Sequence, residues 1–220
     1  MTDPRLDSFS DPAQPRAIML LLHGGQEHSE EAVRNKHASW WRMAAMARSL
    51  RGFADDGHLS MTLLQYRMRG WNGSHDPAPV RDARWALDQV TAQHPGLPVV
   101  LVGHSMGGRT ACRVADDPRV VGVVALAPWL PEGEPNGAVA GRHLRVLHGS
   151  RDNWTSAFWS RSYVERSRPI AASATWESLP GAGHFMFRRP SVWRRFVEDS
   201  VSDILDNATS HEEASSKGSA

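Results

Sequence analysis

Residues 99–108 read VVLVGHSMGG, an apolar run that leads directly into a serine flanked by glycines. The apolar part is typical of a buried strand, and the following residues 109–115 are compatible with a helix. A serine on such a strand-to-helix turn is typical of a nucleophile elbow, in which the backbone of Ser105 is strained and its hydroxyl projects above the sheet. Gly103 and Gly107 fit this turn because side chains there would collide. The string alone has low specificity, so its meaning depends on the rest of the chain.

Composition limits the class of protein. The chain has 220 residues, with 25 lysines and arginines against 24 aspartates and glutamates, which suits one α/β domain. A formal net charge of +1 gives no electrostatic reason to expect nucleic acid or a membrane as partner. The one cysteine, Cys112, excludes an internal disulfide. Residues 1–16 lack a secretory signal core and the apolar run 17–22 is too short to span a bilayer, so we expect a cytoplasmic protein.

Strand-like and helix-like segments alternate along the chain. Continuous apolar runs predict strands that are covered on both faces. Apolar residues at helical spacing between them predict helices, the first of which is expected to open at Ser29. This alternation is typical of a parallel sheet with helices on both faces and right-handed crossovers. We expect six strands, at residues 17–22, 59–66, 99–102, 120–126, 144–147 and 174–179.

In such a sheet, ligands bind beyond the carboxyl ends of the strands, so reactive groups are expected in the loops that follow them. Gly25 and Gln26 follow the first strand, and the backbone amide of either could pair with that of Met106 in an oxyanion hole. Asp152 follows the fifth strand, where an acid can orient an imidazole. His184 lies on a glycine-flanked loop after the sixth strand, where it can act as a general base. Taken singly, each also fits a plainer role as a turn, a helix cap or polar surface.

The chain order Ser105, Asp152, His184 is the order of the catalytic residues in α/β-hydrolases. From about Ala17 to Leu205, the chain resembles that superfamily, as a small lid-less member of the serine esterase/lipase-like kind. Five motifs carry the resemblance: His23-Gly24-Gly25, Arg69-Gly70-Trp71-Asn72-Gly73-Ser74, Gly103-His104-Ser105-Met106-Gly107-Gly108, His148-Gly149-Ser150-Arg151-Asp152 and Gly183-His184.

The resemblance implies a single-domain α/β-hydrolase fold with a mostly parallel six-stranded sheet, helices on both faces and no cap domain. The connection between Pro128 and Leu144 is too short for a cap, and the two leading antiparallel strands of larger relatives are expected to be missing. We expect the domain at residues 16–206, after a flexible N-terminal segment at residues 1–15 and before a disordered tail at residues 207–220.

The resemblance also implies a serine hydrolase that cleaves a carboxylic ester of a small-molecule acyl substrate, with neither a metal nor an organic cofactor. Ser105 would attack the carbonyl carbon, His184 would take its proton and Asp152 would stabilise the imidazolium. Activity should fall at acid pH, as the imidazole becomes protonated. Two alternatives stay open: a thioesterase or amidase that uses the same three residues, and a non-catalytic ligand-binding protein on this fold.

Tryptophans are candidates for the substrate pocket, because the chain has 9 of them. Trp71, Trp129 and Trp154 lie in loops near the expected site and could wall an apolar acyl pocket, although core and rim packing explains each slightly better. Without a cap, this pocket should be open and shallow. The sequence specifies neither the acyl length nor the oligomeric state.

Overall fold

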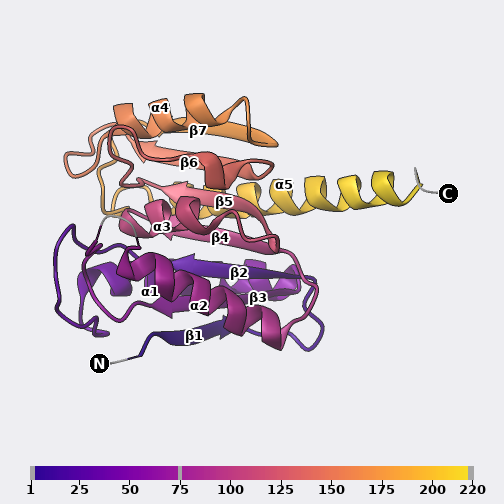
Figure 1. Cartoon of the computed structure of the whole chain (residues 1–220). Coiled ribbons are helices and arrows are strands. Elements are labelled where there is room, and N and C mark those ends of the chain that lie inside the picture. Colours follow the sequence, from indigo (N-terminus) through magenta and orange to yellow (C-terminus); the bar gives the residue numbers. More distant parts are fainter. Residues whose placement is uncertain (1–2, 74–75, 218–220) are drawn as a thin grey trace.

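Seven strands form one sheet in the order β1-β3-β2-β4-β5-β6-β7 in the computed structural model, which describes residues 3–73 and 76–217 (Figure 1). Neighbouring strands are parallel except for β1, which runs antiparallel to β3. The strands are β1 (Arg5–Ser10), β2 (Ala17–Leu22), β3 (Leu59–Gln65), β4 (Val99–His104), β5 (Val120–Leu126), β6 (His143–Gly149) and β7 (Ser173–Leu179).

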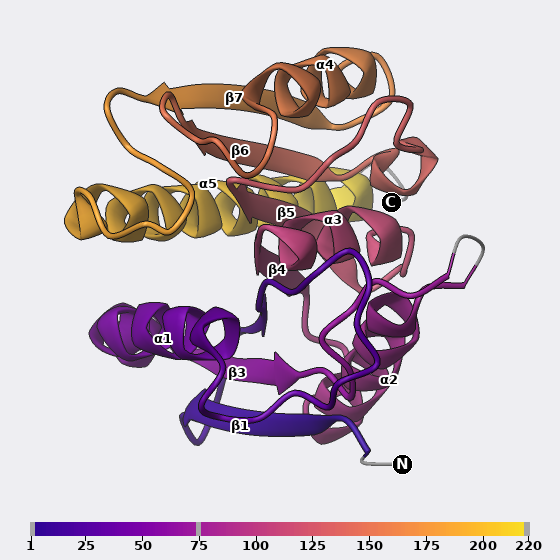
Figure 2. The same ribbon diagram turned by 90° about the vertical axis from the view of Figure 1, so that its left-hand side faces the viewer.

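Helices cover both faces of the sheet, as the alternating sequence predicts. Figure 2 shows α1 and α5 on one face and α2, α3 and α4 on the other. The helices are α1 (Ala38–Asp56), α2 (Ala78–Gln93), α3 (Met106–Val114), α4 (Ala157–Ser167) and α5 (Pro190–Lys217), with a short 3-10 turn η1 (Gly137–Val139).

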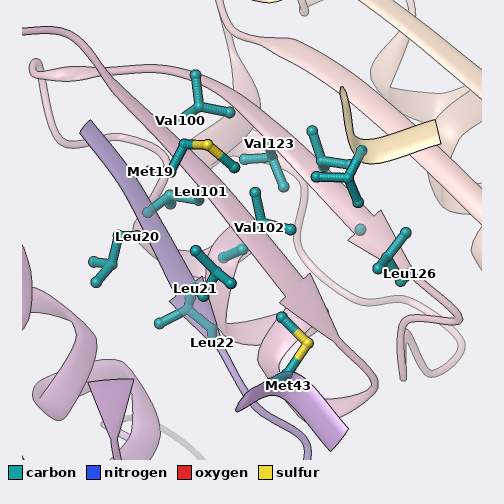
Figure 3. Close-up of a cluster of buried hydrophobic side chains, with 14 of the residues drawn as sticks. Met19, Leu20, Leu21, Leu22, Met43, Val100, Leu101, Val102, Val123 and Leu126 are labelled. Atoms are coloured by element: carbon teal, nitrogen blue, oxygen red, sulfur yellow. The ribbon is translucent and has the colours of Figure 1, made fainter. Parts of the chain in front are cut away.

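The core is centred on β2 and β4, which are buried along their whole length. Figure 3 shows how Leu20, Leu21 and Leu22 of β2 lie beside Leu101 and the other apolar residues of β4. Because helices cover both faces, apolar residues occupy every position of β2 and the first four positions of β4 instead of every second one. Each such side chain stabilises the fold by roughly 1.5–3 kcal/mol relative to an exposed one.

The sheet has one strand more than the six that the sequence predicts. Arg5–Ser10 pairs with β3, so this part of the expected flexible segment is ordered, and one leading antiparallel strand is present. Leu6 and Phe9 are only partly buried against the core. An edge strand of this kind carries few apolar residues, and its hydrophobic pattern is therefore weak.

The first helix begins at Ala38, so the prediction that it opens at Ser29 is wrong. The backbone after Ser29 pairs instead with the loop that follows β3. The amide of Gly70 donates to the carbonyl oxygen of Ser29 at 3.1 Å, and the amide of Arg69 donates to that of Glu31 at 2.9 Å. The carbonyl oxygens of Ser29 and Glu31, which would accept hydrogen bonds within a helix that began at Ser29, are used by these long-range bonds instead.

The last helix continues to Lys217, beyond the domain end expected at residue 206. Extending a packed helix costs less than nucleating a new one, which explains how a polar tail can remain helical. Residues 218–220 of the expected disordered tail lie outside the described residues. Although α5 has 28 residues, neither it nor any other helix in the described ranges is apolar enough to cross a bilayer.

The connection between β5 and β6 contains only η1, so no cap domain covers the carboxyl ends of the strands. This confirms the lid-less fold that the sequence predicts. The site that lies there is consequently reached directly from solvent.

His23 is a buried residue just after β2, and it ties the end of that strand to the end of β3. Its Nδ1–H donates to the carbonyl oxygen of Gly24 at 2.6 Å, and its Nε2 accepts the amide proton of Tyr66 at 3.3 Å. Both bonds require a neutral ring with the proton on Nδ1. Burial lowers the pKa of His23 to about 4.

The folded chain should therefore lose stability as the pH falls below His23's ordinary pKa of 6.5, because only the unfolded chain then protonates this histidine. The contribution of His23 to the free energy of unfolding is complete above pH 6.5, and it declines by about 1.4 kcal/mol per pH unit as the pH approaches the pKa of His23 in the folded chain. Urea unfolding at pH 7, 6 and 5 should show this slope in wild type and a shallower one in His23→Gln, since glutamine donates and accepts without titrating. The same replacement at the exposed His28 should leave the slope as it is in wild type. Equal slopes in wild type and His23→Gln would contradict the assignment.

Candidate active site

Ser105 lies on the sharp turn between β4 and α3, with φ 57° and ψ −120°. Such a positive φ is strained for a residue that carries a side chain. Two glycines allow the turn to form: a Cβ at Gly103 would overlap the carbonyl of Gly107, and one at Gly107 would overlap the carbonyl oxygen of Leu22 on β2. The structure therefore has the elbow geometry that residues 99–108 predict.

Ser105, His184 and Asp152 form one continuous hydrogen-bonded chain. The Nε2 of His184 lies 3.0 Å from the Oγ of Ser105. Its Nδ1 lies 2.8 Å from the Oδ2 of Asp152. Because the carboxylate can only accept, Nδ1 carries the proton and Nε2 is free to accept from the serine hydroxyl. The structure thus brings together three side chains that the sequence places after three different strands.

Asp152 is surrounded by donors. Its Oδ1 accepts from the amides of Trp154 and Thr155 at 2.8 and 2.9 Å, and its Oδ2 accepts from the hydroxyl of Thr155 at 2.9 Å. The Nε2 of His148 lies 3.2 Å from the same oxygen. Burial opposes the charge of Asp152, but the bonds from His148 and His184 and from the Thr155 amide outweigh it and hold the pKa of this carboxyl below its usual range.

His104 holds the backbone of the loop that carries His184. This buried residue donates its Nε2–H to the carbonyl oxygen of His184 at 2.9 Å, and the two rings lie 4.9 Å apart. Burial, together with the neighbouring His184, lowers the pKa of His104 to about 3. The ring is therefore neutral at physiological pH and fixes the backbone of the loop without adding charge beside the base.

Two backbone amides remain candidates for an oxyanion hole. Met106 is the first residue of α3, and the first amides of a helix have no partner within it. Of the two predicted partners, Gln26 already donates its amide to the carbonyl oxygen of Arg69 at 2.8 Å. This leaves Gly25, where a Cβ would overlap both that carbonyl oxygen and the side chain of Met106. The geometry thus favours Gly25 over Gln26.

A cavity of about 760 Å³ lies over these residues. Trp129 and Trp154 line it, as predicted, and Trp154 is exposed and stacks on His184 with 6.3 Å between ring centroids. Trp71 does not line it, so that part of the pocket prediction is wrong. Its ring packs edge-on against Trp129 at 5.9 Å, with the guanidinium of Arg109 over both rings, and so supports the wall from behind. Ser74, which closes the same sequence motif as Trp71, lies outside the described residues.

Sequence reasoning missed His104, His148 and Thr155. A signal existed for His148, because it stands four residues before Asp152 in the same motif. No sequence signal pointed to Thr155, because its contacts with Asp152 form only when the loop after β6 folds back onto that carboxylate. Among the described residues, no group of histidine, cysteine, aspartate and glutamate side chains has the arrangement of a metal site.

The sheet order, the strained elbow and the open strand ends define an α/β-hydrolase without a cap domain. The chain belongs to the serine aminopeptidase S33 family, whose model matches residues 13–204.

Similarity to individual proteins is more distant. Human monoglyceride lipase is 31% identical over 121 residues, which cover 52% of this chain but only 35% of that protein. A lid-less α/β serine hydrolase from Xanthomonas campestris has a TM-score of 0.64 at 17% identity, with 92% of this chain and 95% of that one covered. A monoacylglycerol lipase from Paleococcus ferrophilus has the same TM-score and identity, with 92% and 100% covered. At such identities the two solved structures share the fold alone.

Removing the Thr155 hydroxyl should weaken the hydrogen-bonded chain. We expect Thr155→Val to slow the labelling of Ser105 by a fluorophosphonate about 10-fold, because the buried carboxylate loses a donor and orients His184 less well. Labelling rates measured by intact-protein mass spectrometry provide the readout. Thr175→Val makes the same chemical change on the exposed strand β7 and should label like wild type. A wild-type rate in Thr155→Val would show that the hydroxyl does not serve Asp152.

Proposed function

We propose that this protein is a serine hydrolase that cleaves carboxylic esters of small molecules through an acyl-enzyme. The observation that carries the proposal is the unbroken chain from Ser105 through His184 to Asp152 at the strained elbow. A non-catalytic binding protein has no need to hold a serine hydroxyl against an imidazole that a buried carboxylate orients. The backbone strain at Ser105 occurs at the position where an enzyme of this kind would expose its nucleophile.

Each residue has a distinct part in the proposed reaction. The Oγ of Ser105 attacks the carbonyl carbon as its proton passes to the Nε2 of His184, and Asp152 stabilises the imidazolium. The amides of Met106 and Gly25 hold the oxyanion, and one such donor is worth about 3 kcal/mol in the transition state. His184 then protonates the departing alcohol, and a water activated by the same ring releases the acid.

The names of two relatives support an ester as the substrate, and the size of the cavity supports a small molecule. The relative from Homo sapiens is a monoglyceride lipase, and the one from Paleococcus ferrophilus is a monoacylglycerol lipase. The cavity of about 760 Å³ is of a size that suits a small molecule. The family description, serine aminopeptidase, favours an amide as the second candidate, because the same three residues would attack it.

Activity should decline toward acid pH in a single step. The donors around Asp152 hold the pKa of its carboxyl below the usual range, so this carboxylate stays ionised and adds no step to the acid limb. A profile of log(kcat/KM) against pH should therefore have an acid limb with a slope of one. A slope of two would mean that a second group in the site also titrates.

Replacing the reacting groups tests the mechanism. Ser105→Ala and His184→Ala should each lower kcat on p-nitrophenyl esters by on the order of 10⁴- to 10⁶-fold. Asp152→Asn should cost less than either, about 10⁴-fold or below, because the base is misoriented but present. Melting temperatures near that of wild type would show that the variants fold. Ester turnover by Ser105→Ala at the wild-type rate would refute the proposal.

A panel of matched substrates separates the candidates. An ester, a thioester and an anilide with the same acyl group should be cleaved in the order of leaving-group reactivity if the enzyme is an esterase. A kcat/KM that is higher for the anilide than for the ester would favour the amidase. Absence of fluorophosphonate labelling at Ser105, together with no turnover of any of the three, would favour a binding protein.

A further inference from the structure

Arg42 is a cation of α1 that lines the catalytic cavity without a counter-ion. Within the described part of the chain, the structure gives it neither a hydrogen bond nor an ion pair. Arg69 in the same cavity pairs with Glu31, and Glu27 is an exposed carboxylate that lies 3.7 Å from His28, a residue that is charged only when protonated. Arg42 is therefore a partly buried cation of this cavity that has no counter-ion among the described residues.

The Arg42 guanidinium is held close to the base. It lies over the ring of Phe185 at 4.4 Å and over that of Phe187 at 5.7 Å. The ring of Phe185 in turn lies 5.2 Å from that of His184, so one aromatic ring separates the guanidinium from the base. The Nε of Arg42 is buried and has no hydrogen-bond partner. Stacking on an aromatic face holds the cation in place but leaves its hydrogen-bond donors available.

A second cavity, of about 470 Å³, adjoins the first at this residue. It lies between α1 and the loop before α5, and it shares Ala38, Arg42 and Phe185 with the catalytic cavity. Its lining is mainly apolar, and the charged residues on it are both cations, Lys36 and Arg42. A positive potential in apolar surroundings attracts an anion more strongly than the same charges would in open water.

We propose that Arg42 binds an anionic oxygen group, most simply a carboxylate, on the ester substrate while its carbonyl lies at Ser105. This inference rests on the proposed ester hydrolase and adds a substrate class to it: esters that carry a negative charge beside an apolar body. A guanidinium suits this role because it is always charged and offers several N–H donors in one plane. The apolar part of the substrate would then lie against Phe185 and the second cavity.

The test compares substrates that differ only in charge. In one arm the charge is on the acyl part: p-nitrophenyl adipate with a free carboxylate against its methyl ester. In the other arm it is on the alcohol part: 4-acetoxybenzoate against methyl 4-acetoxybenzoate. In at least one arm, wild type should have the higher kcat/KM for the charged substrate, and added salt should reduce this preference.

Variants assign the preference to Arg42. Arg42→Met should lower the ratio of charged to neutral kcat/KM by about 10- to 100-fold, mainly through KM, and Arg42→Lys should retain part of it. Arg168→Met removes an exposed arginine at the end of α4 and should leave the ratio at its wild-type value. An unchanged ratio in Arg42→Met in both arms would overturn the inference.

Two further measurements cover the other outcomes. If Arg42→Met fails to fold, protection of wild-type Ser105 from fluorophosphonate decides the matter: benzoate should protect more strongly than benzamide, and equal protection would refute anion binding. Ser105→Ala separates this inference from the proposed function. Ester cleavage that depends on Ser105 but shows no charge preference leaves the hydrolase intact and removes the role of Arg42.

Discussion

The elbow lies so close to β2 that only glycine fits at residue 107, where a side chain would overlap the carbonyl oxygen of Leu22. This contact fixes the start of α3 against the sheet and, with it, the strained backbone of Ser105. The position of the hydroxyl and the direction of the Met106 amide both follow from it. The rest of the site is arranged around a serine that cannot move without displacing β2.

Around this fixed serine, burial and hydrogen bonding separate the charged groups from the neutral ones. Burial keeps His23 and His104 neutral, so they act as rigid connectors between loops and strands. Asp152 is also withdrawn from water, yet its donors stabilise the carboxylate form. The negative charge of Asp152 therefore lies beside the Nδ1 of His184, and the guanidinium of Arg42 lies over the ring of Phe185, the next residue in the chain.

The parallel strands and the location of the site could be predicted because both depend on local sequence. A continuous apolar run identifies a buried strand directly, and topology then brings Ser105, Asp152 and His184 to one edge of the sheet. Features that depend on contacts between distant segments could not be predicted. The late start of α1 results from pairing with the loop after β3, and the different positions of Trp71 and Trp129 are decided by tertiary packing. The proximity of Arg42 to Phe185 exists only once α1 meets the loop before α5.

The antiparallel strand β1 occupies the edge of the sheet and pairs with β3 along its length. An uncovered strand presents a row of amide and carbonyl groups to which another chain can add. The residues of β3 are largely apolar and buried, so such an edge would be especially adhesive. A chain shortened to begin after Ser10 would keep every reacting group but expose this surface, and it would be prone to aggregate through strand addition. β1 is short and mostly polar, so it gives the sheet an edge that is less apolar than β3 would be.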